Sequence, residues 1–106
     1  MVTEAIIVSI KPTEAMQKIE EGRDPRRMLS AEQRDIMNAE RESNIIKRVV
    51  EIRTALQEVP KLNVDVHLTI EKLVGAQMII IEVPLRFADT VKQRIALLDC
   101  IEGDPR

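Results

Sequence analysis

Hydrophobic residues gather in three short segments whose spacing predicts β-strands. Residues 2–10 contain an uninterrupted apolar run, which is typical of a strand buried on both faces. Residues 62–71 alternate between apolar and polar side chains, which predicts a strand with one face in solvent. Residues 78–83 form a third apolar run, and a turn at residues 72–76, with Gly75 as its flexible point, would join it to the second strand.

Three helices are predicted from capping residues and from the helical spacing of apolar side chains. Residues 13–21 begin with a threonine N-cap and are followed by a glycine, which predicts a short helix. Residues 31–58 follow a Ser-Ala-Glu-Gln capping box and precede a proline. The last helix would cover about residues 86–101. Its apolar face consists of Phe87, Val91, Ile95 and Leu98.

The second predicted helix is too long for the globule to which it belongs. From residue 31 to 58 it would span about 42 Å, whereas a domain of this size has a radius of gyration of about 13 Å. Residues 38–44 are almost wholly polar, and the helix could be continuous or broken near Ser43–Asn44. Its second half carries a broad apolar stripe, and we expect one flank to pack on the sheet and the other to contact a second copy. The stripe consists of Ile45, Ile46, Val49, Val50, Ile52 and Leu56.

The order of these elements is β-α-α-β-β-α, which predicts an α+β fold. We expect a small, mainly antiparallel three-stranded sheet covered by helices, one of them long, with all 106 residues in a single domain. If the first strand lies beside the third, it stands at an edge of the sheet. An edge strand that is apolar on both faces invites pairing with a second copy of the chain.

The composition limits the classes of function. Apolar residues make up 44% of the chain, which is enough for a packed core. The 16 basic and 18 acidic residues are interleaved, so no basic excess predicts strong nucleic-acid binding. Phe87 is the only aromatic side chain among Phe, Trp and Tyr, so the platform for stacking bases is missing. Because no apolar run approaches about 18 residues and only one cysteine is present, we expect a soluble cytoplasmic protein without membrane contact.

The stretch EEGRDPRRMLS at residues 20–30 places three arginines near the start of the long helix. Guanidinium groups beside a helix N-terminus can hold a phosphate or another anion. The same stretch suits a solvated corner between two helices, because Asp-Pro can cap and begin a helical turn. The corner is favoured over the anion site. The possible anion-binding residues are Lys11, Arg23, Arg26 and Arg27.

The sequence Ile-Val-Ser-Ile-Lys-Pro at residues 7–12, followed by Ala15, Ile19 and Gly22, resembles the opening of ASCH domains. These domains are small PUA-like barrels implicated in binding RNA or modified nucleosides. The family continues after the glycine with a Lys-x-x-Glu-x-Arg type of motif, whereas Arg-Asp-Pro-Arg-Arg follows here, so the basic residues persist and the glutamate is missing. The resemblance covers residues 7–22 and implies a nucleotide or RNA ligand for the same four basic residues.

Few side chains suggest catalysis. His67 is the only histidine and would share the polar face of the second strand with Asp65, so the pair could supply two metal ligands. Two ligands fall short of a catalytic metal site, and we therefore expect an exposed polar face, no bound metal and no cofactor. Cys100 has no second cysteine to pair with, which favours a packed structural thiol over a nucleophile.

The sequence therefore favours a non-catalytic protein that works through protein contacts, as a regulator or an assembly subunit. It would form a homodimer or a higher homo-oligomer. A small anion-binding module for nucleotide or RNA is the second hypothesis, and a metal-dependent enzyme around Asp65 and His67 is the weakest. Rising salt should weaken the binding of an anion, whereas an apolar interface should be nearly indifferent to salt.

Overall fold

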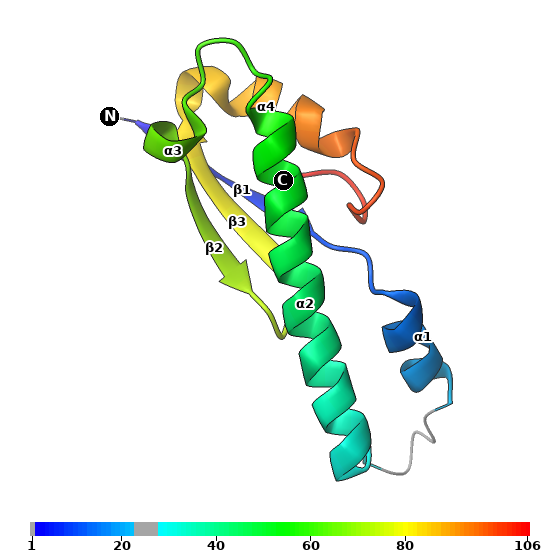
Figure 1. Cartoon of the computed structure of the whole chain (residues 1–106). Helices are drawn as coiled ribbons and strands as arrows, with labels where there is room; N and C mark the ends of the chain where they lie inside the picture. The colour runs from blue at the N-terminus through cyan, green and yellow to red at the C-terminus, as the bar shows by residue number, and fades with distance from the viewer. Residues whose placement is uncertain (1, 23–27) are drawn as a thin grey trace.

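The chain folds as a three-stranded antiparallel sheet with helices over one face (Figure 1). This arrangement comes from a computed structural model, which describes residues 2–22 and 28–106. The strand order is β1-β3-β2, so β1 stands at an edge beside β3, and the α+β fold expected from the sequence is confirmed. The strands are β1 (Thr3–Ser9), β2 (Thr69–Leu73) and β3 (Met78–Pro84).

The two faces of the sheet differ in burial. Ile6 and Val8 of β1 point toward the helices and are fully buried, as are Ile79 and Ile81 opposite them on β3. Ile7 points to the other face and is 37% exposed. The expectation that β1 is buried on both faces is therefore wrong, because α2 (Ala31–Leu56) and α4 (Ala88–Ala96) pack against only one of them.

The outer edge of β1 is already bonded to the end of the chain. Ile7 and Arg106 exchange two backbone hydrogen bonds of 2.7 and 2.9 Å, and the N–H of Glu102 donates to the carbonyl of Ser9 over 2.9 Å. The N–H of Lys11 donates to the carbonyl of Cys100 over 2.9 Å. The condition set from the sequence is met, since β1 stands beside β3 at the edge, but the backbone groups of Ile7 and the carbonyl of Ser9 are occupied within the chain and do not require a second copy.

Helix α2 is one continuous helix that extends beyond the sheet. Ser30 and Gln33 form the predicted capping box at its start, and it ends at Leu56. Its 26 residues span about 39 Å, and the molecule measures 49 × 21 × 20 Å. The second half of α2 lies on the sheet and the first half projects past it, as the predicted length required (Figure 1).

The projecting half of α2 is accompanied by the short helix α1 (Glu14–Glu21). The hydroxyl of Thr13 accepts a hydrogen bond from the N–H of Met16 and donates one of 3.1 Å to Glu40 on α2. Met16 and Met37 are buried where the two helices meet. Ala15 is exposed, so methionine side chains, not alanine, fill this contact.

The alternating segment 62–71 is not one long strand. Residues Val64–His67 form the helical turn α3, and only Thr69–Leu73 joins the sheet. The Asn63 side chain accepts hydrogen bonds from the N–H groups of the next turn, which starts the helix and overrides the strand-like alternation. After β3, the 3₁₀ turn η1 (Leu85–Phe87) leads into α4, which is shorter than the predicted helix 86–101.

Candidate functional site

Helix α2 presents two different apolar faces, and the stripe predicted from the sequence is divided between them. Ile45, Ile52 and Leu56 are fully buried against the sheet and belong to the core of the chain itself. Val49 is partly buried beside them. The remaining two residues of the predicted interface point outward, with Ile46 49% exposed and Val50 59% exposed.

A second apolar row runs along the outward face of α2. Its members follow one another at alternating steps of three and four residues, which keeps them on one side of a helix. All five are exposed, and Ala39 and Ser43 in the middle are small. We call this row the outer stripe. It consists of Ile36, Ala39, Ser43, Ile46 and Val50.

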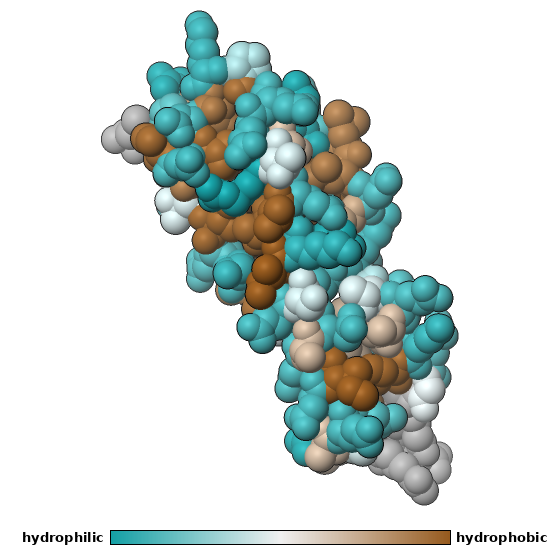
Figure 2. All heavy atoms as spheres, in the orientation of Figure 1, coloured by the Kyte–Doolittle hydropathy of each residue, from teal (hydrophilic) through white to brown (hydrophobic). Residues whose placement is uncertain are grey.

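The outer stripe lies opposite the core because of helical geometry. Each residue turns the helix by about 100°, so Ile45 can face the sheet while its neighbour Ile46 faces away. A shallow hollow of about 440 Å³ lies along the stripe, lined by Ala39, Glu42, Ser43, Ile46 and Lys47. Figure 2 shows hydrophobic side chains reaching the surface over the middle of α2 within mostly hydrophilic surroundings.

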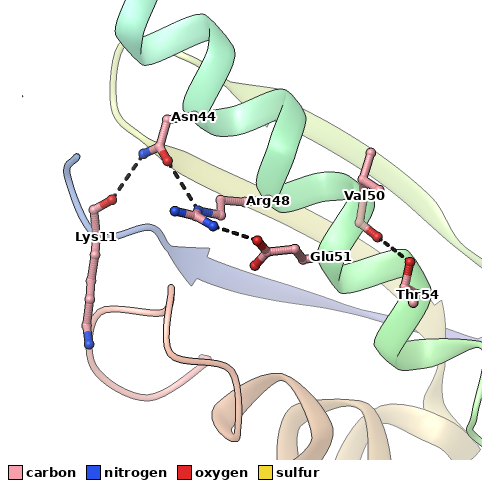
Figure 3. Close-up of polar contacts among 6 residues, drawn as sticks. All are labelled: Lys11, Asn44, Arg48, Val50, Glu51 and Thr54. Atoms are coloured by element: carbon pink, nitrogen blue, oxygen red, sulfur yellow. Dashed lines mark hydrogen bonds and ion pairs between the residues drawn. The ribbon is translucent and has the colours of Figure 1, made fainter. Parts of the chain in front are cut away.

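A buried hydrogen-bond network fixes α2 at the point where it leaves the sheet. Asn44 is 3% exposed and donates to the carbonyl of Lys11 over 3.0 Å and to the side-chain oxygen of Gln77 over 2.9 Å. The guanidinium of Arg48 donates to Asn44 over 3.2 Å and to Glu51 over 2.6 Å (Figure 3). Gln77 also donates to the carbonyl of Arg41, so the network ties α2 to the β2–β3 turn.

Arg48 and Glu51 of this network line part of a cleft of about 670 Å³. Among the described residues that line this cleft, the carboxylates outnumber the cationic side chains, so its charge does not favour an anion. The carboxylates are those of Glu14, Glu51 and Asp99, and the cationic groups are those of Lys11 and Arg48.

Cys100 also lines this cleft, but it is a poor nucleophile there. Burial, and to a smaller extent the adjacent Glu51 through a hydrogen bond and through repulsion of a thiolate, raise the pKa of its thiol to about 11. Arg48 lowers the pKa by a smaller amount. Because the thiolate is the reactive form, Cys100 stays protonated and unreactive near neutral pH.

The predicted anion-binding residues are only partly visible. Arg23, Arg26 and Arg27 lie outside the described residues, so the structure does not bear on them. Lys11 lies at the cleft, and its carbonyl accepts the hydrogen bond from Asn44. The anion-binding role of these four residues stays a prediction.

Asp65 and His67 do not share the face of a strand, because both lie on the helical turn α3. Asp65 accepts a hydrogen bond from Arg53 of α2. His67 accepts through Nδ1 from the N–H of Asn63 over 3.0 Å, and its ring centre lies 5.6 Å from that of Phe87. His67 is therefore packed against an aromatic ring rather than on the open side of the sheet. Within residues 2–22 and 28–106, no three metal-ligating side chains come together.

Comparisons with known proteins do not place the chain in a family. No protein-family model, curated protein or solved structure matches it. The resemblance of residues 7–22 to the opening of ASCH domains therefore rests on the sequence alone. None of the helices in the described part of the chain is both long and apolar enough to cross a membrane.

Proposed function

We propose that this protein is a non-catalytic module that self-associates through the outer stripe of α2. The observation that carries the proposal is the row of exposed side chains at coiled-coil spacing, on the side of α2 opposite the core. Ile36 at one end of the row is 45% exposed, a fraction similar to that of Ile46. A second copy offers the same row in return, and two-fold dimers are the commonest way to cover such a surface.

The size of the stripe indicates how strong this association should be. Ile36, Ile46 and Val50 are each about half exposed, so covering them contributes about 1 kcal/mol per side chain, or about 6 kcal/mol for two copies. Association itself costs at least about 4 kcal/mol. The balance of about 2 kcal/mol corresponds by itself to a dissociation constant of tens of millimolar, and flanking contacts that contribute about 2 kcal/mol more would bring it to about 1 mM. The dimer should therefore be concentration-dependent rather than obligate.

The chemistry of the remaining side chains supports a role without catalysis. Cys100 is held as a thiol, and His67 and Asp65 are engaged in separate structural contacts. The acid–base and nucleophilic candidates found in the sequence are thus occupied in ways that suit stability. Regulation or assembly through protein contacts remains the function that the exposed surface fits best.

Sedimentation velocity and light scattering over a range up to millimolar concentration test this function. The double variant Ile46→Glu, Val50→Glu should stay monomeric, because it places like charges at the seam and leaves the core untouched. Val66→Glu is the control, since Val66 is 74% exposed on α3 and is not a member of the outer stripe. Circular dichroism of all three proteins should be alike. A wild-type chain that remains monomeric at millimolar concentration would remove self-association as the function.

A further inference from the structure

We infer that two copies pack their α2 helices antiparallel, with the two-fold axis level with residues 44–45. This inference rests on the proposed self-association and adds the arrangement of the partner. In the antiparallel register Ala39 faces Val50 of the second copy, and Ser43 faces its Ile46. These pairings follow from the outer stripe and from the charges that flank it.

Packing favours the antiparallel arrangement. A parallel, in-register pair would place Ala39 against its own copy and Ser43 against its own copy, which leaves a gap in the middle of the seam between bulky ends. The antiparallel register places each small residue against a large one. Every layer then holds one bulky aliphatic side chain, and the two helices can approach evenly along the stripe.

The flanking charges favour the same arrangement. Glu40 and Lys47 lie on one flank of the stripe, seven residues apart in the sequence, and Asp35 and Glu42 lie on the other. Antiparallel helices bring equal flanks together, so Glu40 of each copy meets Lys47 of the other. Parallel helices bring opposite flanks together, so Glu42 meets Lys47 but Asp35 meets Glu40. In the antiparallel register centred at residues 44–45, Glu42 lies opposite the partner's Val49 and not opposite an acidic residue, so the repulsive contact belongs to the parallel pair.

The surroundings of α2 leave room for this partner. The sheet, α4 and the buried network lie on the core side of α2, and the hollow that contains Ser43 and Ile46 is open. Glu40 accepts a hydrogen bond from Thr13 through Oε2, which fixes the position of its carboxylate. The dimer would place the two sheets at opposite ends of a rod, each with its open face away from the seam.

Disulfide trapping distinguishes the orientations. In a Cys100→Ser background, Ala39→Cys and Val50→Cys are prepared as separate chains, oxidised alone and then oxidised as a mixture. The antiparallel dimer should give a mixed disulfide only in the mixture, because neither residue meets its own copy. Val66→Cys, which replaces an exposed residue on α3, gives the background rate of random collision in the same mixture.

The other outcomes are equally informative. Disulfides in each single-variant sample would show a parallel pair and overturn the inference. No disulfide above background, with a dimer still seen by sedimentation, would show that another surface mediates it and would also overturn the inference. No disulfide and no dimer would instead refute the proposed self-association.

Charge reversal provides a second, independent test. Lys47→Glu should weaken the wild-type dimer by about threefold to tenfold, because two attractive pairs become repulsive. Adding Glu40→Lys should restore the affinity if the helices are antiparallel. Because Glu40→Lys would also relieve the Asp35–Glu40 repulsion of a parallel pair, Glu42→Lys decides the orientation. Adding Glu42→Lys instead should restore the affinity only if the helices are parallel, and that rescue would overturn the inference.

Discussion

Ile45 and Ile46 are adjacent, chemically identical and oppositely placed, so they allow a sharp test of how α2 is oriented. Ile45 is 0% exposed in the core, whereas Ile46 is 49% exposed on the outer stripe. Replacing either residue by alanine removes the same atoms from the same helix. Any difference between the two variants therefore reports the environment and not the chemistry of the substitution.

The expected difference is large. Ile45→Ala removes buried methyl and methylene groups and leaves a cavity between α2 and the sheet, which should lower the free energy of unfolding by about 2–5 kcal/mol. The total free energy of unfolding of a domain of this size is about 5–15 kcal/mol. The melting temperature of Ile45→Ala should fall by roughly 10–20 °C. Ile46→Ala should change the free energy of unfolding of the monomer by less than about 0.5 kcal/mol, because surface substitutions usually have effects of that size.

Urea unfolding monitored by circular dichroism gives the free energy of unfolding of both variants, provided that the protein is dilute enough to be monomeric. Sedimentation at high concentration should give the reverse ranking, because Ile46→Ala removes part of the seam whereas Ile45→Ala does not. Equal losses of stability in the two variants would refute the reasoning, since α2 would then be rotated differently about its axis.

Three further predictions concern other parts of the chain. Asn44→Ala should cost about 2–3 kcal/mol in urea unfolding, because it leaves buried partners unpaired, whereas Asn38→Ala on the exposed side of α2 should be nearly neutral. Burial raises the pKa of Cys100 from 9.0 to about 11, so between these pH values the native state keeps a proton that the unfolded state loses. The contribution of this thiol to the free energy of unfolding should be fully present below pH 9 and decline toward pH 11. Cys100→Ser should remove that decline. Replacing the three arginines within residues 23–27 by glutamine should change the free energy of unfolding by only several tenths of a kcal/mol. Isothermal titration of the wild-type chain with nucleotides and short RNA should show no heat, and heat that the triple variant abolishes would show that these arginines bind an anion.

Much of the fold could be predicted because capping signals and hydrophobic periodicity agree over long segments. The Ser30 capping box placed the start of α2, and the apolar runs placed β1 and β3. The segment before β2 could not be predicted, since Asn63 competes with the alternation by capping a turn. The β2–β3 turn was also misjudged, because the residue with positive φ is Gln77, whose side chain anchors it to α2, and not Gly75.

The candidate surface could be predicted only in part, because α2 carries two overlapping patterns at similar spacing. Ile45, Ile52 and Leu56 repeat as regularly as the outer stripe, and nothing in the spacing says which row meets the sheet. Three-dimensional packing decides this. The first half of the outer stripe was missed because Ala39 and Ser43 lie in a stretch that reads as polar, although small residues are compatible with a close helix contact.

The buried asparagine explains how one of the two rows is selected. Along residues 45–50 the apolar surface of α2 is broad enough that purely aliphatic contacts with the sheet would tolerate a small rotation of the helix. Hydrogen bonds are directional, and those of Asn44 to Lys11 and Gln77 are buried, so a rotation would break them at considerable cost. Asn44 thus sets the rotation of α2, and that rotation directs Ile46 and Val50 outward, where the proposed partner would bind.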